Sequence, residues 1–302
     1  MHGRFAPSPT GPLHLGNLRT ALVSWLLAKS QEGEWSVRME DLDLVTSSPA
    51  HEADQLQSLE ALGMQPDGPV LRQSERFDLY RDAIATLDRL GRVYECFCTR
   101  REIREAAQAP HEHLPDGAYP GTCRQLTRAR RDALVAQGRR PALRLRAEGE
   151  RFTVHDLFAG TYTGEADDVV LQRTDGVPAY NLAVVFDDAA QGITQVVRGD
   201  DLLASTPRQR LLQQLLGLPE PQYAHVPLVL APDGSRLAKR HGAVTLADLA
   251  ARGLGPANVL TRLGASLQLC APDEPVTIEL LRRRFRVDLV PAAPWSLRAD
   301  EL

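Results

Sequence analysis

The stretch that decides the fold is residues 4–20, which read RFAPSPTGPLHLGNLRT. Residues 3–6 are short and mostly apolar, which is typical of a strand. The prolines and glycine of residues 7–12 exclude regular structure, and residues 18–29 have the pattern of an amphipathic helix. The sequence therefore predicts a strand that leads through a turn into the start of a helix.

The helix start in this stretch suits an anion. The first backbone N–H groups of a helix have no partner inside the helix, and the positive end of the helix dipole lies there. Gly16 lets the backbone come close to a phosphate where a side chain would obstruct, and His14 can add a hydrogen bond. Residues 14–17 taken alone also fit an ordinary capped turn.

The composition indicates a globular protein. The 302 residues are 43% hydrophobic and 25% charged, enough for a sizeable core and about two domains. There is no run of about 18 apolar residues, and the N-terminus leads directly into the predicted strand, so neither a membrane span nor a signal peptide is expected. The cytoplasm is the expected compartment, with a monomer as the default state.

Positive charge is concentrated in one part of the chain. The formal net charge of −4 gives no overall sign of nucleic-acid binding. Between Cys123 and Arg146, however, eight arginines occur with only Asp132 opposing them. Either RNA is contacted locally here, or these arginines form the solvated faces of helices.

Strands and helices alternate along the chain as in a parallel sheet. We expect two halves of an α/β nucleotide-binding domain at residues 1–95 and 176–242, separated by an inserted subdomain at 96–175 and followed by a helical region at 243–302. The expected helices lie at about residues 18–29, 49–62, 76–90, 206–216, 246–251 and 256–263, before a tail rich in Pro and Arg. The expected strands lie at residues 3–6, 34–41, 92–97, 166–172, 179–186 and 193–198, with a further apolar segment at 225–230.

A basic motif near the end of the second half of the nucleotide-binding domain also suits a phosphate ligand. Residues 236–240 read RLAKR, after the turn PDGS and before His241. A flexible basic loop can close over a triphosphate, and the ammonium of Lys239 can stabilise the charge that develops during attack at the α-phosphate. Taken alone, the loop is also typical of a solvated surface.

Polar residues stand at the ends of predicted strands, where open α/β sheets bind ligands. Glu40 can face a bound ammonium, although Glu40, Asp41 and Asp43 together also fit a strand-end turn, a helix cap or a metal site. The guanidinium of Arg198 can bind a carboxylate at two points. Tyr180 can offer its hydroxyl to a ligand or satisfy it in the core.

Three of the four cysteines lie close together in the sequence, at Cys96, Cys98 and Cys123. Cys-x-Cys near a further cysteine suits a tetrahedral zinc site, and a structural disulfide is unusual in the cytoplasm. The fourth donor stays open among His111, His113 and Tyr119, of which histidine is the more common type of ligand. Cys270 stands alone.

In this order, the motifs resemble the catalytic domains of glutamyl-tRNA synthetases, a family of class I aminoacyl-tRNA synthetases. Residues 4–20 resemble the first class I signature and residues 236–240 the second. Asn17 stands where many members carry a second histidine, Ala238 replaces the usual serine, and Arg236 the usual leading lysine. The resemblance implies a Rossmann-like parallel sheet, split by a zinc-bearing inserted subdomain and followed by a short helical C-terminal region.

The resemblance, which covers about residues 3–245, also implies roles for individual residues. The positions that match L-glutamate-binding residues are Arg4, Ser8, Glu40, Tyr180 and Arg198. The positions that match ATP-handling residues are His14, Gly16, Asn17 and Lys239, with His14 and Lys239 as the catalytic pair and Mg²⁺ accompanying ATP. Glu40 is expected to bind the α-ammonium of glutamate, and Arg4 and Arg198 to share its carboxylates.

A narrower resemblance is to a truncated branch of this family, the glutamyl-Q tRNA(Asp) synthetases. Cys-x-Cys followed by Tyr-x3-Cys resembles their zinc site, which selects Tyr119 beside the three cysteines as a ligand of one structural Zn²⁺. About 60 residues follow the lysine motif, too few for the anticodon-binding region of a discriminating glutamyl-tRNA synthetase. The resemblance implies activation of glutamate without tRNA, then transfer to queuosine in tRNA(Asp).

Two other functions stay open at this point. One is a small glutamyl-tRNA synthetase that charges the 3′ end of tRNA. The other is a non-catalytic paralogue that binds RNA or zinc, which the departures at Asn17 and Ala238 favour.

Overall fold

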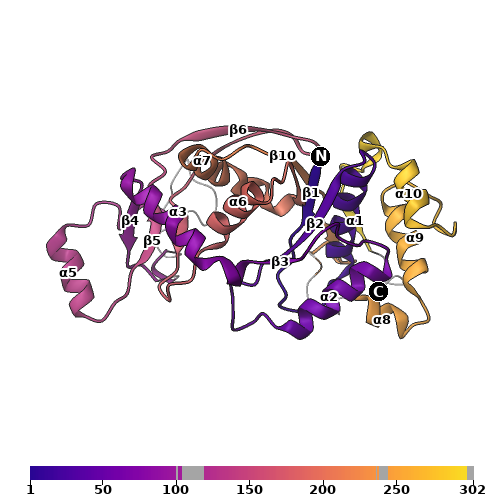
Figure 1. Cartoon of the computed structure of the whole chain (residues 1–302), viewed down its shortest axis with the longest axis horizontal. Helices are drawn as coiled ribbons and strands as arrows, with labels where there is room; N and C mark the ends of the chain where they lie inside the picture. Colours follow the sequence, from indigo (N-terminus) through magenta and orange to yellow (C-terminus); the bar gives the residue numbers. More distant parts are fainter. Residues whose placement is uncertain (100, 104–118, 236, 238–243, 298–302) are drawn as a thin grey trace.

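The computed structural model describes residues 1–99, 101–103, 119–235, 237 and 244–297. The molecule is elongated, with an antiparallel subdomain at one end and C-terminal helices at the other (Figure 1). A parallel sheet lies between them, with strands in the spatial order β10 (Gln222–Val226), β9 (Gln195–Gly199), β1 (His2–Phe5), β2 (Glu34–Met39) and β3 (Leu71–Arg72). Every neighbouring pair in it is parallel, which confirms the expected fold class.

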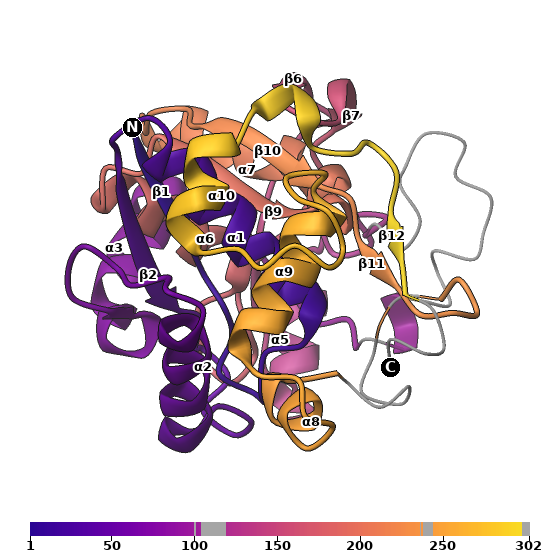
Figure 2. The same ribbon diagram turned by 90° about the vertical axis from the view of Figure 1, so that its right-hand side faces the viewer.

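The main helices of residues 1–95 and 176–242 lie where the sequence predicts them. They are α1 (Leu15–Lys29), α2 (Pro49–Ala61), α3 (Phe77–Arg89) and α7 (Thr206–Leu216). α1 is buried on nearly all sides, because the sheet covers one side and C-terminal helices cover the other (Figure 2). α2 begins at Pro49, and Ser48 Oγ caps it by accepting the backbone N–H of His51.

The direction in which strands are added reverses between β1 and β9. From β1 the chain continues to β2 and β3 on one side, and β9 and β10 are added later on the other side. In open α/β sheets, this reversal leaves a crevice outside the carboxyl ends of the strands, where ligands bind. The residues that follow β1, β2 and β9 are therefore placed around one crevice.

The inserted region contains more structure than the sequence predicts. Its antiparallel sheet and helix are β4 (Val93–Cys96), β5 (Ala142–Leu145), β8 (Val170–Gln172) and α5 (Arg128–Ala136), so the strand expected at residues 166–172 is confirmed only over β8. A hairpin of β6 (Arg151–Asp156) and β7 (Gly160–Glu165) packs against α7 and β10 instead. β7 has two glycines, which weaken its strand pattern. The hairpin carries residues of the inserted region to the parallel sheet.

The strand expected at residues 179–186 is wrong, because the chain forms α6 (Tyr180–Ala190) there. This helix packs against α3, α7 and β8, so its apolar residues are buried on several sides. A continuous apolar run of this kind has no period that distinguishes a helix from a strand. Tyr180 consequently lies in the first turn of a helix, and Asp187 and Asp188 lie near its end.

The C-terminal region is helical, as expected, but has one helix more than the sequence predicts. Its helices are α8 (Leu246–Ala250), α9 (Pro256–Ser266) and α10 (Ile278–Arg284). α10 lies in the tail, where Thr277 caps it by accepting the backbone N–H of Leu280. The remaining short elements are β11 (Val229–Leu230), β12 (Trp295–Ser296), η1 (Gln73–Arg76), η2 (Asp200–Ser205) and η4 (Val287–Leu289). Across the described ranges, no helix combines the length and apolarity needed to cross a membrane.

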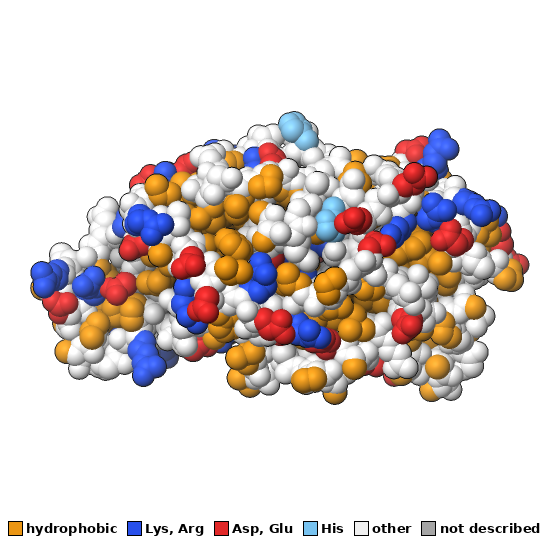
Figure 3. Space-filling model, in the orientation of Figure 1, with side chains coloured by type: hydrophobic (Ala, Val, Ile, Leu, Met, Phe, Trp, Pro, Cys, Tyr) orange, Lys and Arg blue, Asp and Glu red, His pale blue; other side chains and the backbone are white. Residues whose placement is uncertain are grey.

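The arginines of the inserted region divide into two groups. Arg128, Arg130 and Arg131 of α5 are exposed at the end of the molecule, where acidic and basic side chains are interspersed (Figure 3). These three fit the solvated helix face that the sequence allows. Arg139 and Arg144 instead line a cavity together with Ser8, Glu40 and Tyr180.

Candidate functional site

A cavity of about 610 Å³ opens beside the carboxyl ends of β1, β2 and β9, and we call it the ligand cavity. It lies at the reversal in strand order, where this fold binds ligands. The candidate residues that line it are Arg4, Ser8, His14, Gly16, Asn17, Glu40, Tyr180 and Arg198. Lys239 lies outside the described residues. The structure thus brings every described candidate for glutamate and ATP into one space.

His14 caps α1, so the N–H groups at this helix start are not free as the sequence suggests. His14 Nδ1 accepts the backbone N–H of Gly16 at 3.1 Å and of Asn17 at 3.4 Å, and the N–H of Leu15 donates to Val244 O at 3.1 Å. Because Nδ1 accepts, a neutral His14 ring carries its proton on Nε2. A phosphate would therefore meet an imidazole donor in front of the helix start.

Two other residues of the motif support this cap. Asn17 Oδ1 accepts the backbone N–H of His14 at 3.2 Å, which completes a reciprocal capping box. A Cβ at Gly16 would lie 2.9 Å from His14 Cε1 and 3.0 Å from its Nδ1. The lack of a side chain at Gly16 therefore makes room for the imidazole of His14, in addition to letting the backbone come close to a phosphate. Asn17, the departure from the family signature, has a definite structural role.

The two arginines of the ligand cavity have different partners. Arg4 is paired with Asp188, whose carboxylate oxygens lie 3.1 Å from Arg4 Nε and 3.3 Å from its Nη2, while Nη1 donates to Val197 O. Within the described part of the chain, the groups to which Arg198 donates are all uncharged: the side chains of His225, Gln209 and Thr206, at 2.9, 2.6 and 2.9 Å. The charge of Arg198 is therefore the one left available for a ligand carboxylate.

Glu40 is a buried carboxylate with a weak internal partner. Its side chain is 8% exposed, and Oε1 lies 3.4 Å from Arg38 Nη2. Burial raises the pKa of Glu40 to about 7, although the charges of Arg38 and Arg4 act in the opposite direction. A desolvated carboxylate of this kind is stabilised by an added cation such as an ammonium group.

The neighbouring carboxylates of Glu40 hold the chain in place. Asp41 accepts the backbone N–H of Ser74 at 2.9 Å and its hydroxyl at 2.5 Å, which ties β2 to η1. Asp43 Oδ1 accepts the backbone N–H of Val45 at 3.2 Å. The strand-end turn, one of the alternatives left open by the sequence, therefore describes Asp41 and Asp43, while Glu40 alone faces the ligand cavity.

Sequence analysis missed the buried charges behind the cavity. Asp188 accepts from Arg38 Nη1 at 2.7 Å as well as from Arg4, and Asp187 accepts from Arg76 and Tyr80 at 2.8 and 2.6 Å. Burial alone would lower the pKa of Arg38, but its acidic neighbours raise it above the usual range. Two consecutive acids at the end of an apolar run were the available signal, hidden by the incorrect strand.

A second pair that the sequence did not reveal lies beneath Arg198. Asp156, at the end of β6, and His225, in β10, are joined by a 2.5 Å contact between Oδ2 and Nδ1. Both side chains are fully buried. These residues are 69 positions apart, and only the β6–β7 hairpin brings them together.

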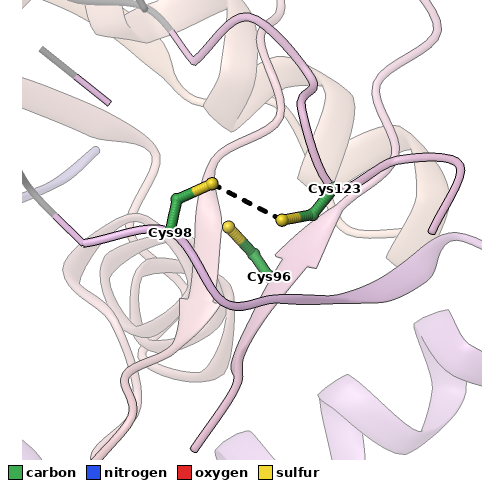
Figure 4. Close-up of side chains that lie close together, drawn as sticks. All are labelled: Cys96, Cys98 and Cys123. Carbon is green, nitrogen blue, oxygen red and sulfur yellow. Dashed lines mark hydrogen bonds between the residues drawn. The ribbon is translucent and has the colours of Figure 1, made fainter. Parts of the chain in front are cut away.

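The three clustered cysteines meet in the inserted region, and with Tyr119 we call them the cysteine cluster. The Sγ atoms of Cys96, Cys98 and Cys123 all lie within 4.8 Å of one another and point toward a common centre (Figure 4). Tyr119 Oη lies 3.4 Å from Cys96 Sγ and 3.6 Å from Cys98 Sγ. His111 and His113, the alternative donors, lie outside the described residues.

The spacing of these donors fits a tetrahedral zinc ion. Zn–S and Zn–O bonds of about 2.3 Å and about 2.0 Å place a sulfur and an oxygen ligand about 3.5 Å apart, and two sulfurs about 3.8 Å apart. The observed Tyr119 contacts match the first value, and the 3.4 Å between Cys98 Sγ and Cys123 Sγ approaches the second. Arg144 Cζ stands 3.8 Å from the centroid of the Tyr119 ring, which favours a negatively charged donor set.

A second cavity, of about 970 Å³, adjoins the ligand cavity and reaches the cysteine cluster. Ser8, Glu40 and Tyr180 line both cavities. The basic side chains that line the second one are those of Arg139, Arg140, Arg144 and Arg173. The same cavity is also lined by the acidic residues Glu40, Asp43 and Asp175, and Asp175 is paired with Arg173.

Comparison with known proteins agrees with this geometry. The family described as tRNA synthetases class I (E and Q), catalytic domain, matches residues 1–302. Glutamyl-Q tRNA(Asp) synthetase of Nocardia farcinica is 57% identical over 300 residues, which cover 99% of this chain and 94% of that protein. The protein of the same name from Symbiobacterium thermophilum is 46% identical, with 99% and 97% covered.

The solved structures give the same result. A glutamate tRNA ligase from Elizabethkingia meningosepticum, crystallised in complex with its amino acid, matches with a TM-score of 0.83 at 28% identity. The match covers 100% of this chain and 68% of that chain. The resemblance to glutamyl-Q tRNA(Asp) synthetases is thereby confirmed, and the chain belongs to the class I aminoacyl-tRNA synthetase family of the glutamate and glutamine type.

Proposed function

We propose that this enzyme activates L-glutamate with ATP and then transfers the glutamate to the queuosine base in the anticodon loop of tRNA(Asp). The observation that carries the activation step is the ligand cavity, which gathers a carboxylate, two arginines and a capped helix start at the reversal of a parallel sheet. The choice of acceptor is supported by the relatives named glutamyl-Q tRNA(Asp) synthetase, which match along nearly their whole length.

Glutamate is held through its three charges. The carboxylate of Glu40 binds the α-ammonium, because both are charged when the pH is above the raised pKa of Glu40. Arg198 takes a carboxylate with its uncompensated charge, and Arg4, already paired with Asp188, adds only hydrogen-bonding capacity. Ser8 and Tyr180 contribute hydroxyl groups, since both line the cavity.

ATP lies over the start of α1, with Mg²⁺ as its counter-ion. The Nε2–H of His14 donates to a phosphate oxygen, and Gly16 and Asn17 keep the imidazole in place. The ammonium of Lys239 stabilises the negative charge that grows on the phosphates during the reaction. The protein supplies position and charge, which are the main contributions to catalysis of phosphoryl and nucleotidyl transfer.

The two steps balance without a covalent enzyme intermediate. An oxygen of the glutamate α-carboxylate attacks the α-phosphorus of ATP, the bond to the β-phosphate breaks, and pyrophosphate leaves. A hydroxyl of queuosine then attacks the carbonyl carbon of the mixed anhydride, loses its proton, and releases AMP. The second cavity, lined by arginines, receives the anticodon loop for this step.

One structural zinc ion is held by Cys96, Cys98, Tyr119 and Cys123. Burial raises the pKa of the Tyr119 hydroxyl, so the phenol keeps its proton in the metal-free protein. A bound zinc ion would have to displace that proton, which would make zinc binding depend on pH. The ion fixes the connection between β4 and the loop that carries Cys123. We also assign the enzyme to the cytoplasm, where these thiols stay reduced.

Mass spectrometry of queuosine-containing tRNA(Asp) tests the complete proposal. The tRNA is incubated with enzyme, ATP, Mg²⁺ and glutamate, and then digested to nucleosides. We expect the added mass of one glutamate on queuosine. Glutamate found on the 3′-terminal adenosine would contradict the proposed acceptor and identify a small glutamyl-tRNA synthetase.

The activation step has a separate test. ATP–pyrophosphate exchange that depends on glutamate, measured without tRNA, is expected for the zinc-loaded protein. Absence of exchange would contradict the proposed activation and favour a non-catalytic paralogue. The two tests together assign a failure either to activation or to the choice of acceptor.

A further inference from the structure

Arg198 is the last member of a buried chain of three polar side chains. Asp156 Oδ2 contacts His225 Nδ1 at 2.5 Å, and His225 Nε2 contacts Arg198 Nε at 2.9 Å. The three residues come from β6, β10 and β9, and all are buried. Only Arg198 lines the ligand cavity.

The hydrogen bonds determine where the proton of His225 lies. The Nε–H of Arg198 can only donate, so His225 Nε2 must be the acceptor, and the ring proton therefore lies on Nδ1 and points to Asp156. Burial lowers the pKa of His225, which keeps the ring neutral. Burial opposes ionisation of Asp156, but hydrogen bonds from His225 and from Ala159 N lower the pKa of Asp156 to about 2.

The opposite tautomer would oppose the contact with Arg198. With the proton on Nε2, two N–H donors would face each other across 2.9 Å, and the guanidinium would have to turn away. Asp156 thus selects the tautomer that keeps Arg198 in its observed plane. Tyr223 supports the same plane, with its ring centroid 5.4 Å from Arg198 Cζ.

This arrangement leaves the positive charge of Arg198 to act on the ligand. A guanidinium has five N–H groups, and His225, Gln209 and Thr206 accept one each. Among the described residues, one N–H of each terminal nitrogen takes no part in these bonds, and it can donate to a ligand carboxylate. A carboxylate as direct partner of Arg198 would cancel this charge, whereas the imidazole does not.

We propose that Asp156 and His225 form a positioning pair that fixes the orientation of Arg198 for the glutamate carboxylate. The inference deepens the proposed function, on which the identity of the ligand rests. Neither residue touches the ligand: His225 acts through Arg198, and Asp156 acts through His225. The β6–β7 hairpin is consequently part of the amino-acid site, although it belongs to the inserted region of the sequence.

Asp156→Asn tests the pair with little change in shape. Asp156 Oδ1 accepts the backbone N–H groups of Phe158, Ala159 and His225 at 3.0, 2.9 and 3.0 Å, and Oδ2 also accepts the N–H of His225 at 3.2 Å. An asparagine oxygen in the Oδ1 position keeps the bonds from Phe158 and Ala159 and the shorter contact with His225 N, and only the longer contact with His225 N is lost. The new NH₂ group then replaces Oδ2 and donates to His225 Nδ1, which moves the ring proton to Nε2. The variant therefore inverts the tautomer and retains the turn.

The readout is the dissociation constant of glutamate, measured by calorimetry without ATP, beside that of ATP. We expect Asp156→Asn to weaken glutamate binding about tenfold, or about 1.4 kcal/mol, and to change ATP binding less than about twofold. Asp168→Asn is the control for the loss of a buried carboxylate, because the Asp168 side chain is fully buried and accepts from Tyr94, Arg124 and Ala147 N, none of which contacts Arg198 or His225. Unchanged glutamate binding in Asp156→Asn, or equal weakening of both ligands, would overturn the proposal.

A second pair of variants covers the case in which Asp156→Asn fails to fold. His225→Gln keeps an acceptor oxygen for Arg198 Nε, whereas His225→Leu removes it. We expect weaker glutamate binding in His225→Leu than in His225→Gln, and equal values would overturn the proposal. Because these measurements need no catalysis, a wild-type protein that lacks ATP–pyrophosphate exchange would contradict the proposed function while still reporting on the positioning pair.

Discussion

In and behind the ligand cavity, Arg4 and Arg38 are already paired with the buried carboxylate of Asp188, whereas in the cysteine cluster three thiols and a phenol face one another. The cavity is thus prepared by internal ion pairs that link strands and helices far apart in the sequence. The cluster is assembled from a short segment, and a bound cation would stabilise its donors as anions. We therefore expect changes in the cavity to act on function, and changes in the cluster to act first on local structure.

Lys239→Ala is expected to have the largest effect. Loss of one charge that stabilises the transition state lowers the rate of ATP–pyrophosphate exchange by about 100-fold to 1,000-fold. Glutamate binding, measured by calorimetry, should stay nearly unchanged because Glu40 and Arg198 hold the amino acid. The chain has one other lysine, Lys29, which pairs with Asp67 on the surface, and Lys29→Ala is therefore the control. Equal losses of exchange and glutamate binding would contradict the role of Lys239.

The pH dependence of glutamate binding tests the role of the buried Glu40 carboxylate. Glu40 has a pKa of about 7, raised by burial, so its ionised form is lost as the pH falls below that value. The ammonium of glutamate stays protonated there, and the KM for glutamate in exchange should rise about tenfold per pH unit below pH 7. Glu40→Gln should bind glutamate weakly and remove this dependence. A flat wild-type profile would contradict the assignment of Glu40 to the ammonium.

These cavity residues could be found in the sequence because the fold itself brings them together. Glu40 and Arg198 stand at the carboxyl ends of parallel strands, and such ends meet at one edge of a sheet. A strand pattern and a motif at its end were therefore enough to place both in one cavity.

The residues that prepare the cavity could not be found in this way. Asp188 was hidden by the incorrect strand at residues 179–186, since a buried helix and a buried strand have the same apolar run. Asp156 reaches His225 only through packing of the β6–β7 hairpin on β10, and no local pattern encodes that contact. The sequence therefore indicated residues that line the cavity, but not the buried residues that pair with them.

Cys98→Ser tests the expectation that changes in the cysteine cluster act first on local structure. The variant should lose the metal, so that analysis finds about one zinc per wild-type chain and none in the variant. Exchange should fall by less than about threefold, because no cavity ion pair involves the cluster, while transfer to tRNA(Asp) should fall about tenfold or more. Cys270→Ser is the control, since Cys270 Sγ instead donates to Thr261 O. A wild-type protein that is folded without zinc would contradict the metal site.

Asn17→Ala is expected to have the smallest effect. It tests whether the capping box of the first motif holds the His14 imidazole in place, as the ion pairs hold the arginines of the cavity. The change removes the side-chain acceptor for His14 N, half of the capping box, and should lower the free energy of unfolding by about 1 kcal/mol. Denaturant unfolding measures this loss, and Asn17→Asp, which keeps the acceptor, should restore most of it. The KM for ATP should rise more than the KM for glutamate, because the loosened cap frees the imidazole that meets the phosphate. Unchanged stability together with an unchanged KM for ATP would mean that the bonds from Gly16 N and Asn17 N to His14 Nδ1 hold the ring without the second half of the box.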